Sequence, residues 1–366
     1  MESSSTSRYT TVADVAQLAQ VSKAQAARAL GGYGAVSDEV RSRVLAAAET
    51  LQYHPNELAR SMNTGRSKTI GVVVGDIENP YFSLAMRGIY DTCKAGGFDV
   101  ILINTGEDLS TEIDAVNVLL DKRVDGMIVA PVTRSPSTHL KRVVDSGRPV
   151  VLLDRKVPSL PVDTVVAEMQ QVSYQAARHL LDEGHTRVGY ISSLDVGGAD
   201  FTVDLDLGSN PVAERIAGMR RAFDEGGVAL PVDLIRLGAG KQHSIADLVD
   251  ALLAGPDPAT AIVASDSVIA LEALAELQRA GIRIPDDVSF LMFDELPWAG
   301  LMTPPITVVA QPVYDQGVAA AEILLRRIGG DRSEPEHLAL PSRLIVRGSV
   351  AAIGSPVDPV TTGASA

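Results

Sequence analysis

Residues 11–30 read TVADVAQLAQVSKAQAARAL, and this stretch decides how the fold begins. Thr11 and Asp14 stand at the spacing of a helix capping box, and small apolar residues then recur on one helical face. After a short break, Ser22 and Gln25 repeat the capping spacing and predict a second helix start. The stretch therefore predicts two short helices joined by a tight turn.

A third helix is expected to follow. Gly31-Gly32 ends the second helix, and Ser37 offers the next N-cap. The apolar residues after it recur at helical spacing, so they would pack on the first two helices; they are Val40, Val44, Ala47, Ala48 and Leu51. Capping and periodicity alone leave open whether this three-helix bundle is only structural or binds DNA.

Charge is distributed unevenly along the chain, whose formal net charge is −14. Residues 1–68 carry eight Lys and Arg against six Asp and Glu, and the rest of the chain carries 24 against 40. Phosphate attracts basic residues and repels acidic ones, so only the first part is suited to a DNA duplex.

Length and composition narrow the class of protein. A chain of 366 residues predicts two or three domains. No apolar run approaches the roughly 20 residues that cross a bilayer, and residues 1–10 lack the apolar block of a secretory signal, so we expect a cytoplasmic protein. The single cysteine, Cys93, excludes a disulfide within one chain, and we expect it to be a buried apolar residue.

From residue 70 onward, short apolar runs alternate with amphipathic segments, which predicts parallel βαβ units in two similar lobes. The predicted strands are 70–74, 100–103, 127–129 and 150–153, then 188–192, 233–237, 261–264 and 288–292. The predicted helices are 80–96, 111–121, 137–146, 171–183, 212–225, 244–254 and 267–280. In open α/β sheets, ligands bind beyond the carboxyl ends of the strands, so a cleft between the lobes is the expected site.

Polar and aromatic side chains follow several of these predicted strands. They are Asp76, Asn79, Tyr81, Phe82, Asp154, Arg155, Arg215, Asp266, Asp294 and Trp298. Rings, carboxylates and guanidinium groups suit a polyhydroxylated ligand, and a sugar fits this set best. Tyr81 and Phe82 could instead be core residues at a helix start, and Asp266 could be only an N-cap.

Residues 11–30, together with VSDEVRSRVLAAAETLQYHPNELARSMNTGRSKTIGVVV at 36–74, resemble the headpiece of the lactose-repressor/galactose-repressor family of bacterial transcription regulators. The resemblance continues to about residue 350. It implies a three-helix helix-turn-helix headpiece at 10–55, a hinge helix and linker at 56–68, and a two-lobe, periplasmic-binding-protein-like sensor domain at 69–350. Lobe one would comprise 69–167 and 308–328, and lobe two 168–307 and 329–350, between disordered ends at 1–9 and 351–366.

The resemblance also implies how the headpiece meets DNA, with the second helix in the major groove and the hinge helix in the minor groove. Lys23 and Gln25 would reach base edges, while Arg28 and the Arg41/Arg43 pair would hold phosphates. The implied DNA-binding residues are Thr11, Ser22, Lys23, Ala24, Gln25, Arg28, Arg41, Asn56, Ala59 and Met62. Met62 would wedge between base pairs where the family usually has Leu, or it would only pack in a linker.

The chain departs from the family at three headpiece positions, namely Gln20, Ala27 and Gly31. Gln20 stands where the turn usually has Gly, and a left-handed Gln there costs on the order of 1 kcal/mol. In the sensor domain, the resemblance implies effector contacts at Asp76, Tyr81, Phe82, Arg155, Arg215, Asp266, Asp294, Trp298 and Gln311.

Segment 194–211, LDVGGADFTVDLDLGSNP, is longer than the usual family connection and contains four aspartates. Their spacing lacks the terminal Glu of a calcium loop, so we favour a solvated flap over a calcium site. No cofactor or metal is expected. The histidines show no metal-ligand spacing, and no catalytic motif occurs, which argues against an enzyme.

Two alternatives remain. An exported sugar-binding protein would have an export signal and would lack a headpiece. A scaffold protein would leave the polar residues of the cleft unexplained. We therefore expect a homodimeric DNA-binding regulator of a pseudo-palindromic operator, controlled by a sugar-like effector. Only the resemblance favours repression over activation. Whether the effector releases the protein from DNA, as an inducer, or strengthens DNA binding, as a corepressor, stays open. The chain end contains no heptads, which favours a dimer over a tetramer.

Overall fold

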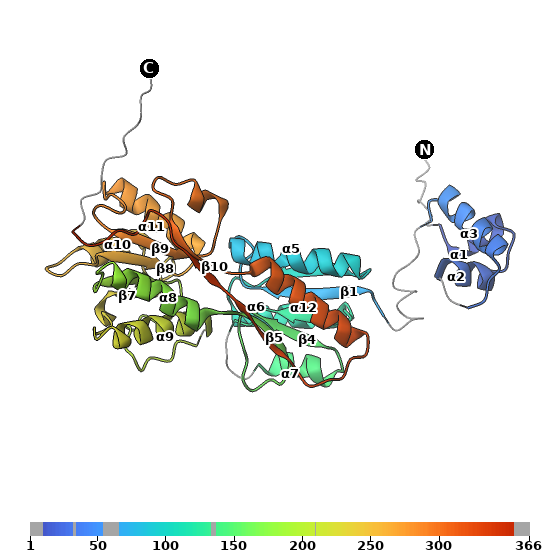
Figure 1. Cartoon of the computed structure of the whole chain (residues 1–366). Coiled ribbons are helices and arrows are strands. Elements are labelled where there is room, and N and C mark those ends of the chain that lie inside the picture. Colours follow the sequence, from blue (N-terminus) through green and yellow to red (C-terminus); the bar gives the residue numbers. More distant parts are fainter. Residues whose placement is uncertain (1–9, 32–33, 54–65, 133–136, 209, 355–366) are drawn as a thin grey trace, which may run out of the picture. The chain divides into compact units, whose positions relative to one another are not determined.

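The computed structural model describes residues 10–31, 34–53, 66–132, 137–208 and 210–354. The chain forms two compact units, Met1–Lys68 and Thr69–Ala366, and each is described by itself (Figure 1). The predicted hinge helix, with Asn56, Ala59 and Met62, lies outside the described residues, as do the predicted disordered residues 1–9 and 355–366.

The first unit contains the three predicted helices, α1 (Val12–Leu18), α2 (Lys23–Gly31) and α3 (Asp38–Thr50). The predicted N-caps of α1 and α3 both form. Thr11 caps α1 in a capping box, and the Ser37 side chain caps α3 by accepting from the amide of Val40. The buried core consists of small residues, namely Val15, Ala16, Ala19, Ala26, Ala29, Val44, Ala47 and Ala48. Small side chains let the short helices approach closely.

The turn between α1 and α2 has the predicted left-handed residue, since Gln20 has a φ of +52°. Arg43 of α3 supports this turn. Its guanidinium donates to the carbonyl oxygen of Ala19 at 2.5 Å and to that of Gln20 at 2.9 Å. Arg43, which is predicted to contact phosphate, also stabilises the left-handed turn in this structure.

The second unit contains two six-stranded sheets. The first has the strand order β11-β5-β4-β3-β1-β2, and its strands are β1 (Thr69–Val74), β2 (Asp99–Asn104), β3 (Gly126–Val129), β4 (Val150–Leu153), β5 (Asp163–Glu168) and β11 (His337–Pro341). The second has the order β12-β10-β9-β8-β6-β7, with β6 (Val188–Ile191), β7 (Ile235–Arg236), β8 (Ala261–Ala264), β9 (Ser289–Phe293), β10 (Thr307–Ala310) and β12 (Arg343–Ile345).

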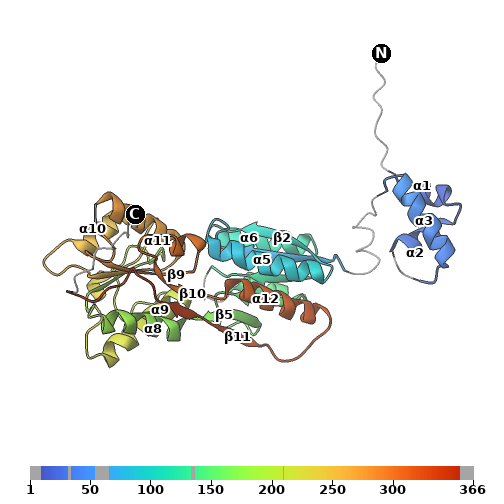
Figure 2. The same ribbon diagram turned by 45° about the horizontal axis from the view of Figure 1, so that its top comes forward.

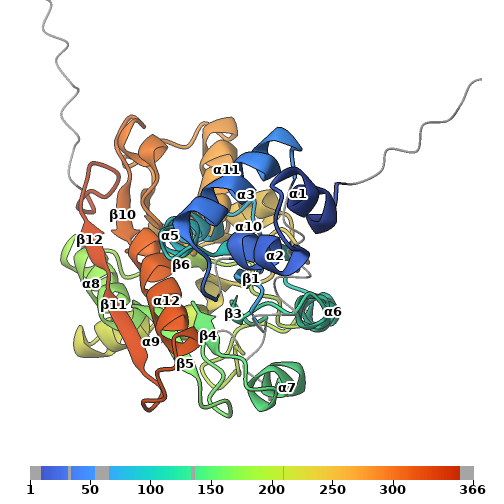
Figure 3. The same ribbon diagram turned by 90° about the vertical axis from the view of Figure 1, so that its right-hand side faces the viewer.

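Helices cover both faces of each sheet, so each lobe has three layers. In lobe one, α5 (Pro80–Ala95) and α12 (Val313–Ile328) cover one face, and α6 (Leu109–Asp121) and α7 (Thr138–Asp145) cover the other (Figure 3). In lobe two, α8 (Met169–Asp182) and α9 (Asn210–Glu225) lie opposite α10 (Ile245–Leu253) and α11 (Ser267–Arg279). The inner strands β3, β4, β8 and β9 are buried on both faces, which explains their continuous apolar sequences.

The chain crosses between the lobes three times, after β5, after β10 and after β11 (Figure 2). Two predicted lobe assignments need correction here. Residues 308–310 were assigned to lobe one but belong to β10 of the second sheet, and β11 was assigned to lobe two but extends the first sheet. The sheet that each of these strands joins is decided by backbone pairing with strands distant in the sequence. Such long-range pairing leaves no local pattern in the sequence.

Residues 351–353 correct the predicted extent of the disordered tail. The carbonyl oxygen of Ala351 lies 3.0 Å from Nε2 of His185, and the amide of Ile353 donates to the carbonyl of Glu183 at 2.9 Å. Burial is the main cause that lowers the pKa of His185. The tail is therefore attached to lobe two through residue 353.

Candidate DNA interface and effector cavity

The N-terminal turn of α2 presents the predicted DNA-contacting residues. Ser22, Lys23 and Ala24 are exposed, whereas Ala26 and Ala29 on the opposite face are buried in the bundle core. This division frees the first turn of α2 to enter a groove, because the bundle itself does not need those side chains.

Two predicted DNA-contacting residues have internal partners. Gln25 accepts hydrogen bonds from the amide and the hydroxyl of Ser22, both at 3.0 Å, and so completes the capping box. Arg28 donates through Nε to the carbonyl oxygen of Ala24 at 3.2 Å. Arg41 is half-buried, and its Nε has no hydrogen-bond partner among the described residues.

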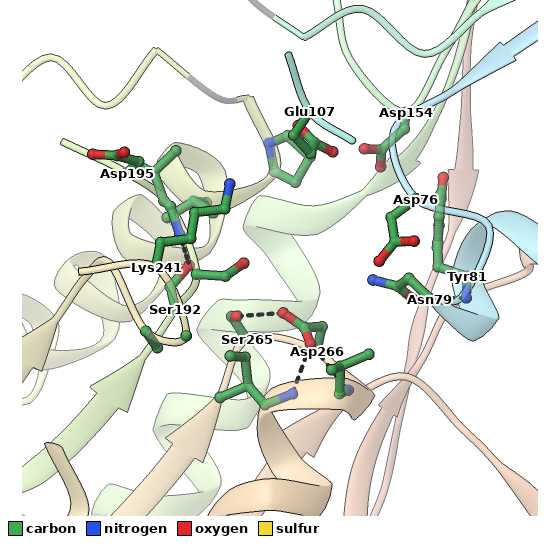
Figure 4. A pocket seen from close by; sticks show the side chains of 18 of the residues that line it. Asp76, Asn79, Tyr81, Glu107, Asp154, Ser192, Asp195, Lys241, Ser265 and Asp266 are labelled. Atoms are coloured by element: carbon green, nitrogen blue, oxygen red, sulfur yellow. Dashed lines mark hydrogen bonds between the residues drawn. The ribbon is translucent and has the colours of Figure 1, made fainter. Parts of the chain in front are cut away.

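A cavity of about 600 Å³ lies between the two lobes, at the carboxyl ends of their strands. Eight of the nine predicted effector residues line it; they are Asp76, Tyr81, Phe82, Arg155, Arg215, Asp266, Asp294 and Gln311. Figure 4 shows Asp76, Asn79 and Tyr81 of lobe one across the cavity from Ser192, Asp195 and Lys241 of lobe two. The volume is in the range typical of pockets for small organic ligands.

Trp298 is the predicted residue that the fold does not bring to this cavity. It lies in the short 3₁₀ helix Pro297–Gly300 and packs, partly buried, against the apolar core beneath α10 and α11. Trp298 is not among the described residues that line the cavity.

The lobe-one wall is built around Asp154 and Arg155, directly after β4. Asp154 has a φ of +67°, which turns the chain sharply at the strand end. Arg155 donates from Nη1 and Nη2 to the two carboxylate oxygens of Glu107, at 2.7 and 3.0 Å. Burial lowers the pKa of the Arg155 guanidinium, but the attraction of the Glu107 carboxylate is stronger, so the pKa is raised overall.

Tyr81 completes this wall from the first turn of α5. Its hydroxyl donates to Oε1 of Gln316 at 2.9 Å and is buried. Burial, and then the neighbouring Asp154 carboxylate, raise the pKa of Tyr81 well above its ordinary value, so the phenol stays neutral. Burial likewise raises the pKa of Asp154. Tyr81 is therefore both a core residue and a cavity residue.

The lobe-two wall is built around Asp294, directly after β9, where φ is +75°. One carboxylate oxygen accepts from Nε2 of Gln311 at 2.7 Å, and the other accepts from the amide of Ser267 at 3.3 Å. Burial raises the pKa of Asp294 to about 6, against the attraction of Arg215. Asp294 therefore titrates close to neutrality.

Arg215 of α9 lies between these acidic groups. Its guanidinium carbon is 4.5 Å from the centre of the Phe293 ring, and the residue is 7% exposed. Its charge lowers the pKa values of both Asp154 and Asp294, yet it has no ion pair with any residue in the described part of the chain. Arg215 can therefore donate hydrogen bonds to a ligand without first losing a salt bridge.

Asp266 has both roles that its position suggested. One oxygen caps α11 by accepting from the amides of Val268 and Ile269, both at 3.0 Å, and the other accepts from the hydroxyl of Ser265 at 2.8 Å. Asp266 also lines the cavity. It presents a carboxylate whose orientation is fixed by the helix terminus.

Several cavity residues were not predicted as effector contacts, among them Glu107, Ser192, Lys241 and Ile245. Glu107 follows β2, Ser192 follows β6, and Lys241 follows β7. Ser192 directly follows its strand, so the rule that selected Asp154 would have found it, whereas Glu107 and Lys241 lie further from their strand ends.

Segment 194–208 is exposed over most of its length, as predicted for a solvated flap, but two of its side chains anchor it. Phe201 and Leu207 are each only 9% exposed and belong to the core cluster of α8 and α9. Across the described residues, no three His, Cys, Asp or Glu side chains come together as a possible metal site. None of the described helices is both long and apolar enough to span a membrane.

Comparison with known proteins agrees with this two-unit organisation. Residues 11–56 match the model of bacterial regulatory proteins of the lacI family, and residues 67–347 match that of periplasmic binding proteins and the sugar-binding domain of the LacI family. The second match alone spans more than half of the chain.

Whole-length relatives show the same order of parts. The transcriptional regulator DegA of Bacillus subtilis is 31% identical over 94% of this chain and 99% of its own length. The transcriptional repressor PurR of Aliivibrio salmonicida is 29% identical over 93% and 98%. A LacI family regulator of Enterococcus faecium, solved with bound ribose, is 30% identical over 78% and 99%, with a TM-score of 0.67.

The two family models follow each other along the chain in the same order as the two units of the structure, the three-helix unit first and the two-lobe unit second. A family of transcription regulators is not catalytic, in agreement with the absence of a predicted catalytic motif. The chain belongs to the LacI family and is a DNA-binding transcription regulator.

Proposed function

We propose that the protein is a homodimeric repressor that binds a pseudo-palindromic operator and responds to a sugar effector in the interlobe cavity. The observation that carries the proposal is the cavity itself, whose fixed carboxylates, neutral phenol and unpaired guanidinium complement hydroxyl groups. Each of these groups can donate to or accept from a polyol.

The relatives support the two finer parts of this proposal. PurR of Aliivibrio salmonicida is a repressor, and the Enterococcus faecium regulator binds ribose. Repression and a sugar effector are therefore the simplest assignment for a chain of the same family. The effector residues we propose are Asp76, Tyr81, Phe82, Arg155, Arg215, Asp266, Asp294 and Gln311.

Exposed apolar side chains support pairing of two chains. On lobe one, Leu84 of α5, Leu102 of the edge strand β2, and Leu109 and Val118 of α6 are 37–45% exposed. Figure 2 shows α5, β2 and α6 side by side along one edge of the lobe. Exposed apolar side chains gathered on neighbouring elements are typical of a protein contact, and a second copy would cover them.

Lobe two exposes apolar residues of its own, with Leu271 of α11 at 56% and Leu301 at 82%. A dimer that pairs both lobes would bury both surfaces and bring two headpieces to one duplex. Two-fold symmetry then requires a pseudo-palindromic operator.

In the headpiece, we assign base contacts to Lys23 and Gln25 and backbone contacts to Thr11, Ser22, Ala24, Arg28 and Arg41. The hinge residues Asn56, Ala59 and Met62 are assigned to the minor groove. Effector binding changes the angle between the lobes and thereby the separation of the two hinge segments. Coupling of about 1–3 kcal/mol would change operator affinity roughly 5- to 150-fold.

The test begins with selection of DNA from a random-sequence pool by the purified full chain. We expect enrichment of a two-fold symmetric site. Lys23→Ala with Gln25→Ala should abolish that preference, whereas Lys141→Ala at an exposed position of α7 should leave it unchanged. Enrichment of only an asymmetric site would contradict the dimer model.

The second part of the test is titration of the selected complex with sugars. One sugar should change operator affinity by at least about fivefold. Purine bases and nucleosides form the comparison panel. A response only to these would overturn the sugar assignment and leave the operator result intact.

A further inference from the structure

The segment between β6 and α9 forms a wall beside the cavity, which its two ends line with Leu194, Asp195, Leu207 and Gly208. We define this wall as residues 194–208. Phe201 and Leu207 anchor it in the core cluster of α8 and α9, and Leu205 packs against the same cluster. Because buried apolar side chains hold it at two points, the wall has a defined surface toward the cavity.

One exposed side chain joins the wall to the turn that follows β7. Gln242 donates from Nε2 to Oδ1 of Asp195 at 2.6 Å and accepts from the amide of Gly198 at 3.1 Å. The amide of Gln242 itself donates to the carbonyl oxygen of Gly238 at 2.8 Å. Gln242 therefore fixes the first part of the wall without taking part in the apolar core.

The wall gives this end of the cavity an apolar floor with a polar rim. Leu194 and Leu207 of the wall line the cavity together with Val212 and Ile245, which are 7% and 4% exposed. Asp195 and Lys241 supply a carboxylate and an ammonium group on the side of the cavity that lies across from Asp76 and Tyr81 (Figure 4).

The opposite end has different chemistry. Asp76, Asp154 and Arg155 bring charged groups close to Tyr81, with Arg215 and Asp294 nearby. A ring bound there would be held mainly by hydrogen bonds, whereas a ring at the wall would place an apolar face on leucine and isoleucine side chains.

The volume allows both ends to be filled together. The cavity volume of about 600 Å³ lies in the middle of the range of roughly 300–1,000 Å³ that is typical of small-ligand pockets. A single pyranose would fill only part of that space, so a second ring has room beside it.

We infer that the wall, with Lys241, Gln242 and Ile245, forms a second subsite that binds the second ring of a disaccharide effector. The inference rests on the proposed function, since it refines which sugar the cavity takes. Lys241 donates to hydroxyls of the second ring, Leu207 and Ile245 contact its apolar face, and Gln242 positions the wall.

The experiment is isothermal titration of the full chain with four disaccharides, cellobiose, maltose, lactose and trehalose, and with glucose and galactose. One disaccharide should bind at least about tenfold more tightly than either monosaccharide, a gain of about 1.4 kcal/mol. Lys241→Ala and Gln242→Ala should each weaken that disaccharide about five- to tenfold and change monosaccharide affinity less than about twofold.

The matched controls are Lys141→Ala and Gln278→Ala, which remove the same side chains from exposed helix positions outside the cavity. They should bind every sugar as the wild type does. A purely structural role of Gln242 would weaken monosaccharide and disaccharide binding equally, and that result would overturn its positioning role.

The remaining outcomes separate this inference from the proposed function. Equal affinity for a monosaccharide and the disaccharides, unchanged by the Lys241 and Gln242 variants, overturns the second subsite and leaves a sugar-responsive regulator. Failure of all six sugars to bind overturns both the subsite and the sugar assignment, whereas operator selection still tests DNA binding.

Discussion

Asp154 of lobe one and Asp294 of lobe two occupy the same place in their sheets. Each follows the strand that is third in its sheet order, and each has a left-handed φ. Each backbone amide donates at 2.9 Å to a carbonyl of the adjacent strand, that of Val165 for Asp154 and that of Val309 for Asp294. The two lobes thus place one carboxylate each at equivalent points of the cavity.

Their arginine neighbours differ. In lobe one, Arg155 is held by Glu107 in a two-bond ion pair. In lobe two, Arg215 stacks on Phe293 and has no ion pair with a described residue. Equivalent backbone positions therefore do not imply equivalent roles: lobe one has already neutralised its guanidinium, and lobe two keeps its own available to a ligand.

The largest effect is expected from Arg215→Met, which preserves packing on Phe293 but removes the charge. Effector affinity should fall about 100- to 1,000-fold, or ~3–4 kcal/mol, because a buried charged donor is lost. The pKa of Asp294 should rise further, since Arg215 lowers it in the wild type. Effector titration and the pH dependence of unfolding measure the two effects.

Arg221→Met is the control for this substitution. Arg221 lies on the same helix and also stacks on a ring, with its guanidinium carbon 4.3 Å from the centre of Tyr174, but it is exposed and outside the cavity. Its loss should leave effector affinity unchanged. Equal losses in both variants would indicate that α9 is merely destabilised.

The next effect concerns pH, through Asp294→Asn. The pKa of about 6 in the folded chain exceeds the ordinary 3.8, so folding favours the protonated carboxyl. This stabilisation, at most about 3 kcal/mol, is complete below about pH 3.8 and is lost as the pH rises through about 6. Relative to the variant, the wild type should lose that amount between pH 4 and 7.5 in urea unfolding.

Asp154→Asn sharpens the comparison between lobes. Burial also raises the pKa of Asp154, so its variant should change the pH dependence with the same sign. Parallel stability profiles of the wild type and Asp294→Asn across this pH range would show that folding does not raise the pKa of Asp294.

The core strands could be predicted from sequence because they are buried on both faces. The predicted runs 150–153 and 261–264 are β4 and β8 residue for residue. β11 could not be assigned in the same way, since its burial alternates along an edge position and its partner β5 is distant in the chain. Local pattern identifies strands, whereas the sheet that a crossing strand joins depends on long-range pairing.

The cavity was also predicted from local sequence, because polar residues directly after a strand end lie at the edge of the sheet. Glu107 is a cavity residue that this reasoning did not find. Asp154 and Asp294 immediately follow their strands and are held by strand geometry. Glu107 follows the end of β2 at a greater distance, and only its ion pair with Arg155 places it on the wall. Side chains that reach the site through a partner are not visible in strand-end patterns.

A smaller effect is expected from Glu107→Gln. The substitution removes the charge behind two hydrogen bonds and leaves Arg155, among the described residues, with only its longer ion pair to Asp154, at 3.5 Å, so stability should fall by about 1–2 kcal/mol. Urea unfolding measures the loss. No change in stability would mean that desolvation fully offsets the ion pair. Arg155 of lobe one would then gain no net stabilisation from its carboxylate partner, like Arg215 of lobe two.

The smallest effect is expected from Trp298→Phe, because Trp298 packs on the lobe-two core instead of the cavity. Trp298 was predicted to line the cavity because it follows the strand end at Asp294 closely. Between the two residues, however, the chain enters a 3₁₀ helix, and the ring packs on the core. Phe retains most of the apolar contact, so effector affinity should change less than about twofold while stability falls by about 1 kcal/mol. A tenfold loss of affinity with unchanged stability would place the indole on the ligand after all, and lobe two would then hold its effector by stacking as well as through Arg215.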